Sequence, residues 1–244
     1  MGNRFETQDK LIAATRQILI SDGIEGCTLE NICSRAGFTR GAFYSNFATK
    51  ESLLGALAED EYANLIDRLR EQVQKWAANP HHVVESRVNA QGDADGANQH
   101  LVMEDLLFEA LDAIGVDKEL YVIHSELLTR SVRDADWGAR LLDLNKEFIA
   151  ELSNVLTVIL QAVGRQPTQS IRALTHSVVG LVMRAAGIAA WRTAAYDHPR
   201  EYRLPQSHFE TVAVSEEKTS IADSPARDIV EMILILLYAA SEPS

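Results

Sequence analysis

Helical spacing of apolar residues most constrains the fold of this chain, because it runs through nearly the whole length without a convincing alternating strand. In residues 8–21 and 29–36, for example, apolar side chains recur at intervals of three and four. The pattern predicts an all-α protein, with helices near residues 8–21, 29–36, 40–45, 50–78, 100–113, 118–134, 138–163, 168–196 and 226–240. The polar stretches 88–98 and 197–225 are expected to be irregular connections.

Charge is distributed unevenly along the 244 residues, whose formal net charge is -12. Residues 1–55 hold six basic and six acidic residues, so the whole negative charge lies in the remainder. An acidic body repels polyanions. Any nucleic acid must therefore meet the N-terminal unit, although a neutral charge there does not prove DNA binding.

Several protein classes are disfavoured by composition and motif. The apolar run 229–240 is too short to cross a bilayer, and 174–191 is interrupted by His176 and Arg184. The first ten residues lack an apolar run, so we expect no signal peptide. Cys27 and Cys33 are expected to be small buried residues. We therefore expect a cytosolic protein without contact to a membrane.

Sequence motifs of common enzymes are missing. We find no glycine-rich phosphate loop, nucleophile elbow or metal-spaced set of ligands. His81 and His82 with Glu85 could bind a metal, but a solvated loop is the stronger interpretation. The expectation is a protein that is not an enzyme and has no cofactor and no metal.

Residues 28–50, TLENICSRAGFTRGAFYSNFATK, combine two short capped helices with a glycine between them. Thr28 can cap a helix over 29–36, Gly37 breaks it, and Thr39 can cap a second helix over 40–45. Two short helices around a tight turn fit helix-turn-helix geometry. The same pattern also occurs as plain core in helical bundles, so alone it is a weak signal.

The second short helix has side chains suited to DNA. Thr39 and Tyr44 have hydroxyls for phosphate oxygens, and Arg40 can reach guanine or a phosphate. Gly41 and Ala42 are small and allow close approach to a groove. Thr28 and Lys50 each begin a helix, where exposed backbone N–H groups can hold a phosphate.

Residues 8–54 resemble the N-terminal domain of the TetR-type family of bacterial transcriptional regulators. The resemblance lies in Gly23, Thr28–Ile32, Ala36–Phe38, the Phe43-Tyr44 pair, Phe47 and Lys50–Leu54. It implies a homodimer that binds double-stranded DNA at a palindromic operator, usually as a repressor released by a small-molecule effector. It also implies a helix-turn-helix domain over 1–54 and a regulatory and dimerisation domain over 55–244.

The resemblance assigns DNA contacts by position. Thr28, Thr39, Tyr44 and Lys50 correspond to contacts with the DNA backbone, and Arg40, Gly41 and Ser45 correspond to positions that face bases. Asn46 stands where many members carry histidine. It either contacts a phosphate or tolerates the left-handed turn that ends the helix.

The body is expected to supply dimerisation and effector binding. Segments 168–196 and 226–240 are the most apolar, and burial against a second copy is favoured over burial within one subunit. The interface is assigned to Val178, Val182, Ile229, Ile233, Leu236 and Leu237. Candidate effector-binding residues are Tyr121, His124, Trp137, Arg184 and Trp191, for each of which core packing is the competing interpretation. Arg184 either pairs with an acid across the dimer or holds an anionic ligand.

Two other classes of protein stay open. One is a helical scaffold or protein-interaction module without ligand control, and the other is an enzyme with a helical active site. A regulator would lie in the bacterial cytosol and on the nucleoid when bound to DNA. The sequence leaves activation open as an alternative to repression.

Overall fold

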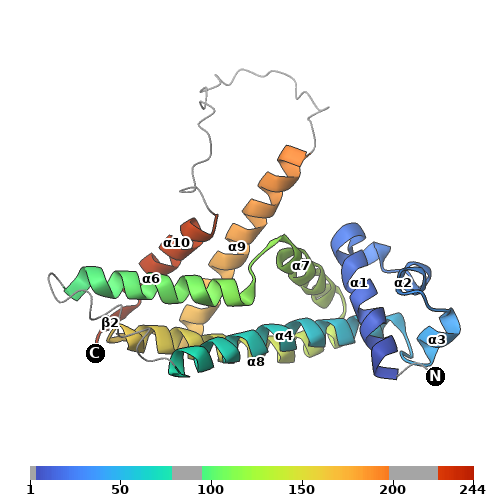
Figure 1. Cartoon of the computed structure of the whole chain (residues 1–244), viewed down its shortest axis with the longest axis horizontal. Helices are drawn as coiled ribbons and strands as arrows, with labels where there is room; N and C mark the ends of the chain where they lie inside the picture. The colour runs from blue at the N-terminus through green and yellow to red at the C-terminus, as the bar shows by residue number, and fades with distance from the viewer. Residues whose placement is uncertain (1–3, 79–94, 198–224) are drawn as a thin grey trace, which may run out of the picture.

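The computed structural model describes residues 4–78, 95–197 and 225–244, and these are nearly all helical (Figure 1). The helices are α1 (Arg4–Gly26), α2 (Leu29–Ala36), α3 (Arg40–Tyr44), α4 (Lys50–Ala78), α6 (Asp95–Ile114), α7 (Lys118–Arg133), α8 (Ala135–Ala162), α9 (Ile171–Asp197) and α10 (Pro225–Ala239). The expected all-α class is therefore confirmed.

Two helices differ most in length from the expectation. α1 runs on to Gly26 through a break at Gly23, whose φ of 69° is left-handed. α6 begins at Asp95, so residues 95–98 are helical and not part of an irregular connection. The first turn of a helix needs no apolar stripe, which is why periodicity places its start too late. Residues 79–94 and 198–224, which hold most of both expected connections, lie outside the described residues.

Two short strands correct the expectation of a chain without strands. β1 (Arg165–Pro167) and β2 (Ser241–Pro243) pair antiparallel, with Gln166 opposite Glu242. Arg165 fixes the pair, because its Nε donates to Ser241 Oγ at 2.8 Å and its guanidinium lies 4.8 Å from the centroid of the Tyr238 ring. Three residues are too few to show an alternating pattern in a sequence.

Buried apolar residues form two clusters. The N-terminal core joins α1–α3 to parts of α4, α7 and α8, and consists of Leu11, Ile18, Leu19, Cys27, Ile32, Cys33, Phe43, Phe47, Leu53, Leu54, Leu57, Ala58, Tyr62, Ile123, Leu127, Trp137 and Leu141. The body core lies among the remaining parts of α4, α6, α8, α9 and α10. Phe148 on α8 packs against both clusters and so links them.

The two cores are joined by long helices. α4 and α8 lie side by side along the long axis of the molecule, with α1, α2 and α3 at one end (Figure 1). The N-terminal core continues along α4 through Leu57 and Ala58 to Tyr62. The boundary proposed between residues 54 and 55 therefore falls inside a continuous helix.

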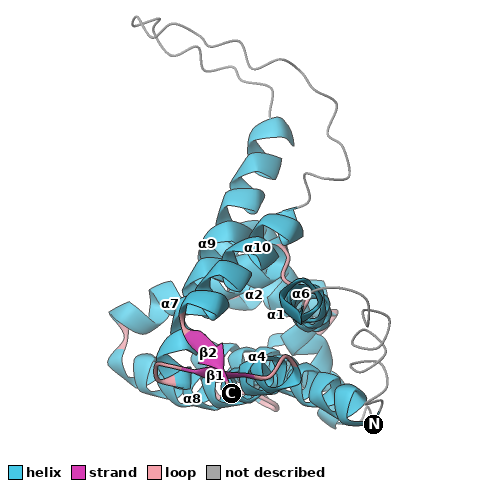
Figure 2. Cartoon of the chain, turned by 90° about the vertical axis from the view of Figure 1, so that its left-hand side faces the viewer, coloured by secondary structure: helices cyan, strands magenta, loops and turns pink. Residues whose placement is uncertain are grey.

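Helix α9 is both long and apolar. Of the described residues, only Ile171–Arg192 is long and apolar enough, by length and composition, to cross a membrane, and 33% of that window is buried. α9 packs against α7, α8 and α10, and Figure 2 shows it beside α10 on one side of the body. A core helix of this kind meets the same length and composition test.

Candidate nucleic-acid interface and effector cavity

Local capping explains why residues 28–44 fold as two short helices. Thr28 Oγ1 accepts a hydrogen bond from the backbone N–H of Asn31 at 3.2 Å, and Thr39 Oγ1 accepts one from Ala42 at 3.2 Å. Gly37 ends α2 with a left-handed φ of 73°. The chain therefore turns sharply between α2 and α3 and leaves both N-terminal ends exposed.

Aromatic side chains hold α3 rigidly on the N-terminal core. Phe43 is fully buried, and its ring centroid lies 6.1 Å from that of Phe47 and 5.4 Å from that of Tyr44. Tyr44 itself turns outward and is 59% exposed. One side of this short helix is therefore fixed, while the other faces solvent.

The residues assigned to DNA contact lie mostly on the surface. Thr28, Thr39, Arg40, Gly41, Tyr44 and Ser45 are exposed, whereas Asn46 and Lys50 are half-buried. The Arg40 side chain is 67% exposed, and its Nη2 lies 3.8 Å from Glu30 Oε2. An exposed ion pair of this kind contributes about 0–1 kcal/mol, so Arg40 can exchange it for another partner at little cost.

Ser45 and Asn46 also make hydrogen bonds within the protein. Ser45 Oγ donates to the carbonyl of Gly41 at 2.9 Å, and Asn46 Nδ2 donates to the carbonyl of Ala42 at 2.8 Å. Asn46 Oδ1 is buried without a hydrogen-bond partner among the described residues. Asn46 therefore holds the end of α3, and a contact with phosphate would be additional.

The start of α4 is a reciprocal cap. The Ser52 N–H donates to Thr49 Oγ1 at 3.0 Å, and the Thr49 N–H donates to Ser52 Oγ at 3.2 Å. The cap places Lys50 in the first turn of a long helix, beside α3 in the chain and at the same end of the molecule (Figure 1).

Ion pairs tie the N-terminal helices to the body. Arg16 on α1 donates to Glu61 on α4 at 2.7 Å and to Glu119 on α7 at 2.9 Å. Arg140 on α8 donates to Glu59 on α4 at 2.6 Å. The position of the helix-turn-helix unit is thus coupled to α4, α7 and α8, the helices that also line the cavity described next.

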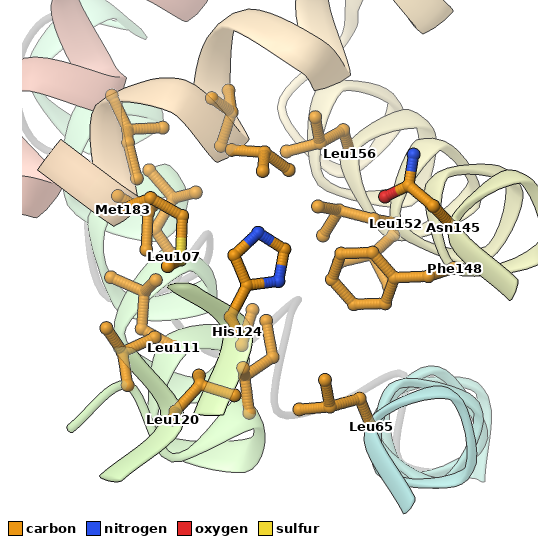
Figure 3. Close-up of a pocket in the computed structure, with 18 of the residues that line it drawn as sticks. Leu65, Leu107, Leu111, Leu120, His124, Asn145, Phe148, Leu152, Leu156 and Met183 are labelled. Atoms are coloured by element: carbon orange, nitrogen blue, oxygen red, sulfur yellow. The ribbon is translucent and has the colours of Figure 1, made fainter. Parts of the chain in front are cut away.

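A cavity that is partly open to solvent lies between α4, α6, α7, α8, α9 and α10. Its wall is largely leucine, isoleucine and valine. Figure 3 shows the His124 imidazole in the middle of the cavity, with Asn145 and Phe148 on the α8 side. Of the five residues assigned to an effector, only His124 lines it.

The other four candidates lie elsewhere. Trp137 is buried in the N-terminal core, where its Nε1 donates to the carbonyl of Leu127 at 3.3 Å. Tyr121 packs its ring against Gly187. Arg184 lies on the surface with its guanidinium 5.5 Å from the centroid of the exposed Trp191 ring. Trp137 is therefore a core residue, and Arg184 does not line this cavity, so it is not placed to hold an anionic ligand there.

The residues assigned to a dimer interface are mostly core residues of one subunit. Val178, Ile229, Ile233 and Leu237 are buried within the chain, while Val182 and Leu236 are partly buried. Both helices are apolar on most sides, so periodicity does not show which side meets the protein's own core. The exposed side of α10 instead carries Met232 and Ile235, which are 40% and 65% exposed.

Metal-binding and reactive groups are sparse in the described ranges. Among these residues there is no cluster of three or more His, Cys, Asp or Glu side chains that could hold a metal ion, and His81, His82 and Glu85 lie outside them. Cys27 and Cys33 are free and buried. Burial raises the pKa of the Cys27 thiol to about 11, so it stays protonated at neutral pH.

Two polar residues of the cavity escape sequence analysis. Tyr62 and Asn145 line it together with His124. Both stand in long helices whose pattern predicts only helix, and neither belongs to a motif. The cavity arises from the packing of helices distant in sequence, which periodicity does not reveal.

Comparison with known proteins yields one family model. Residues 11–57 match the model described as bacterial regulatory proteins of the tetR family. The matched segment covers α2, α3 and the start of α4, and so contains each residue assigned to DNA contact.

Relatives and solved structures agree with that match. The transcriptional regulator UidR of Escherichia coli K12 is 23% identical over 155 residues, which cover 62% of this chain and 78% of UidR. The regulator CymR of Pseudomonas putida is 39% identical over 71 residues, which cover 29% of this chain and 35% of CymR. The structure of FadR from Bacillus subtilis in complex with stearoyl-CoA has a similar fold, with a TM-score of 0.57 and 14% identity over 94% of this chain and 96% of FadR.

Proposed function

We propose that this chain, a TetR-type DNA-binding transcriptional regulator, acts as a homodimer on a palindromic operator and represses transcription until a small-molecule effector releases it. The observation that carries the proposal is that α3 has one buried side and one exposed side. Arg40 and Tyr44 face solvent, while Phe43 anchors the opposite side in the N-terminal core. A rigid, outward-facing helix end is what insertion into a major groove requires.

The proposed contacts divide by chemistry. Arg40, Gly41 and Ser45 face bases, where a guanidinium can bond guanine O6 and N7. The hydroxyls of Thr28, Thr39 and Tyr44, together with the Lys50 ammonium, contact phosphates and set the position of the protein on the duplex. Asn46 supports the end of α3 and adds a phosphate contact.

The dimer forms through the exposed sides of α9 and α10. Gly180 is exposed on α9, and an added Cβ there would meet nothing within 4 Å, so a second helix can approach closely. Met232 and Ile235 supply the apolar contact from α10. Arg184 is exposed on α9, and the acidic Glu231 is exposed on α10, which gives opposite charges to pair across a two-fold axis.

Control by an effector follows from the connection between cavity and DNA-binding unit. Ligand-induced movement of α4 or α7 would be passed on through the Arg16 pairs and the shared N-terminal core. The separation of the two recognition helices would then no longer match successive turns of DNA. The regulator would act in the bacterial cytoplasm, bound to the nucleoid when it represses.

Salt-dependent binding to DNA tests the proposal. Fluorescence anisotropy of a labelled random-sequence duplex should show binding that weakens steeply as salt rises from about 50 to 200 mM, because counterions are released from phosphates. Lys50→Ala should lower the slope of log affinity against log salt by about 1. Lys146→Ala is the matched control, since Lys146 is an exposed lysine of α8 paired with Asp143. A protein that binds no duplex at low salt would instead be a scaffold or interaction module.

A further inference from the structure

The cavity wall is uncharged. None of the described residues that line the cavity is an Asp, Glu, Lys or Arg. Leu107, Ile159, Val178 and Ile233 are typical of the wall and belong to the body core. A ligand that fills this space therefore gains chiefly from burial of apolar surface.

Three polar side chains interrupt the apolar wall, and they come from three different helices. They are Tyr62 on α4, His124 on α7 and Asn145 on α8. Within the described parts of the chain, none of the three side chains makes a hydrogen bond to another residue. His124 and Asn145 are half-buried and Tyr62 is nearly fully buried, and all three line the cavity, so their unpaired polar atoms are available to a ligand.

These groups are neutral at physiological pH. Burial raises the pKa of Tyr62 to about 12, so the phenol keeps its proton. Burial also lowers the pKa of His124, which favours the neutral imidazole. An anion or cation in the cavity would lose its hydration without gaining an opposite charge. An uncharged hydroxyl, carbonyl or amide would exchange its bonds to water for bonds to these three side chains.

The polar groups lie where the cavity adjoins the N-terminal core. Tyr62 is itself part of that core, and its ring lies edge-on to Phe148, with centroids 6.0 Å apart. His124 follows Ile123, another residue of the same core. The polar residues therefore come from parts of α4, α7 and α8 next to the N-terminal core, while most of the remaining wall belongs to the body core.

We propose that the effector is an uncharged, largely apolar molecule with one hydrogen-bonding group, which Tyr62, His124 and Asn145 hold while the apolar part packs against the leucine, isoleucine and valine side chains of the wall. The name effector rests on the proposed function, but the binding itself does not. Because the bonding group touches α4, α7 and α8 together, its arrival fixes their spacing. Glu119, the partner of Arg16 from α1, lies on the same helix as His124.

A matched set of probes tests the chemical class. The affinities of the full-length protein for 1-decanol, decanoate and decanoyl-CoA can be measured by isothermal titration calorimetry. These three ligands carry a similar alkyl chain, but the end group is neutral in 1-decanol and charged in the other two. We expect 1-decanol to bind with at least about tenfold higher affinity than either anion, because only the alcohol enters without an unpaired charge. Tighter binding of decanoate or decanoyl-CoA, or failure of 1-decanol to bind, would overturn the proposal.

Conservative variants test the three residues. Tyr62→Phe, His124→Phe and Asn145→Leu should each weaken 1-decanol binding by about three- to tenfold, the usual effect of one lost hydrogen bond. Tyr121→Phe is the matched control, since it removes a hydroxyl from a tyrosine that does not line the cavity. Tyr62→Phe deletes a hydroxyl without a partner in the described structure, so this variant should fold normally. Unchanged affinity in all three would contradict the assignment.

Failure of this inference and failure of the proposed function give different results. If the protein binds duplex DNA but not 1-decanol, the inference alone is wrong. If it binds 1-decanol through the three residues but no duplex, the cavity assignment stands and the regulatory function is wrong. Release of DNA on addition of 1-decanol would support both.

Discussion

At the scale of single residues, Arg40 carries the proposed sequence specificity. It is exposed, and its ion pair with Glu30 spans 3.8 Å. Arg40→Ala should cost about 1–3 kcal/mol of binding free energy and relax preference at one position in each half-site, because a bidentate bond to guanine is lost. Competition binding against operators altered one base pair at a time would measure this.

The control for Arg40 is another exposed arginine. Arg133, at the end of α7, is exposed and has no ion pair with another described residue. Arg133→Ala makes the same change of charge outside α2 and α3 and should leave specificity unaltered. An equal loss of affinity for every sequence in Arg40→Ala would instead make Arg40 a phosphate contact.

His124 should make stability depend on pH. Its pKa is lowered by burial from an ordinary value of 6.5, so the unfolded chain takes up a proton before the folded one as the pH falls through 6.5. The free energy of unfolding therefore decreases on acidification, until the pH drops below the lowered pKa of the folded state. Tyr62, the other titratable group of the cavity, ionises far above this range.

Replacement of His124 isolates that contribution. Urea unfolding between pH 7 and pH 5 should show a smaller loss of stability in His124→Phe than in the natural protein. Asn145→Leu serves as control, because it alters the same cavity without removing a titrating group. Equal pH dependence in His124→Phe and the natural protein would show that His124 titrates normally.

At the scale of elements, Gly37 determines the turn between α2 and α3. Its φ of 73° is left-handed, yet an added Cβ would meet nothing within 4 Å. Gly37→Ala should therefore lower the free energy of unfolding by about 1–2 kcal/mol through backbone strain alone. Gly37→Asn should lower the free energy of unfolding by less, since asparagine tolerates this conformation. Chemical denaturation that shows no loss in Gly37→Ala would mean the turn relaxes without strain.

The sequence predicts those elements whose ends carry local signals. Helix 29–36 is confirmed to the residue as α2, because Thr28 caps it and Gly37 ends it. The long helix expected at 50–78 is likewise confirmed as α4. β1 and β2 were not predictable, because three-residue strands depend on pairing between distant segments.

The cavity shows the limit of prediction for the candidate site. His124 was among the expected effector residues and lines the cavity, whereas Tyr62 and Asn145 were not expected. Arg184 stood out as a charge within an apolar helix, yet it lies on the surface beside Trp191. Which side of a helix faces a cavity depends on how neighbouring helices pack, and no local pattern records that.

At the scale of the whole molecule, the account requires a second copy. Ile235 is 65% exposed on α10, so a charge there should not disturb the subunit's own core. Ile235→Glu should convert the dimer to monomers in light scattering, because the apolar contact across the two-fold axis would bury an unpaired carboxylate. Leu236 is a poorer choice for this test, since it packs against the body core.

The matched control for dimerisation lies on α7. Val132 is 83% exposed and distant from the proposed interface in sequence. Val132→Glu should remain dimeric. Dimers that persist in Ile235→Glu would place the interface on another surface, and monomers in the natural protein would remove the basis for a palindromic operator.

The most direct test of the central claim is selection of bound duplexes from a random DNA pool by the full chain. We expect enrichment of an inverted repeat whose half-site centres lie about 34 Å, or a multiple of it, apart, since two α3 helices must enter grooves on one face of the duplex. The same selection with Arg40→Ala should keep the spacing and lose preference at one position per half-site. Absence of enrichment, or enrichment of single sites without two-fold symmetry, would contradict the account.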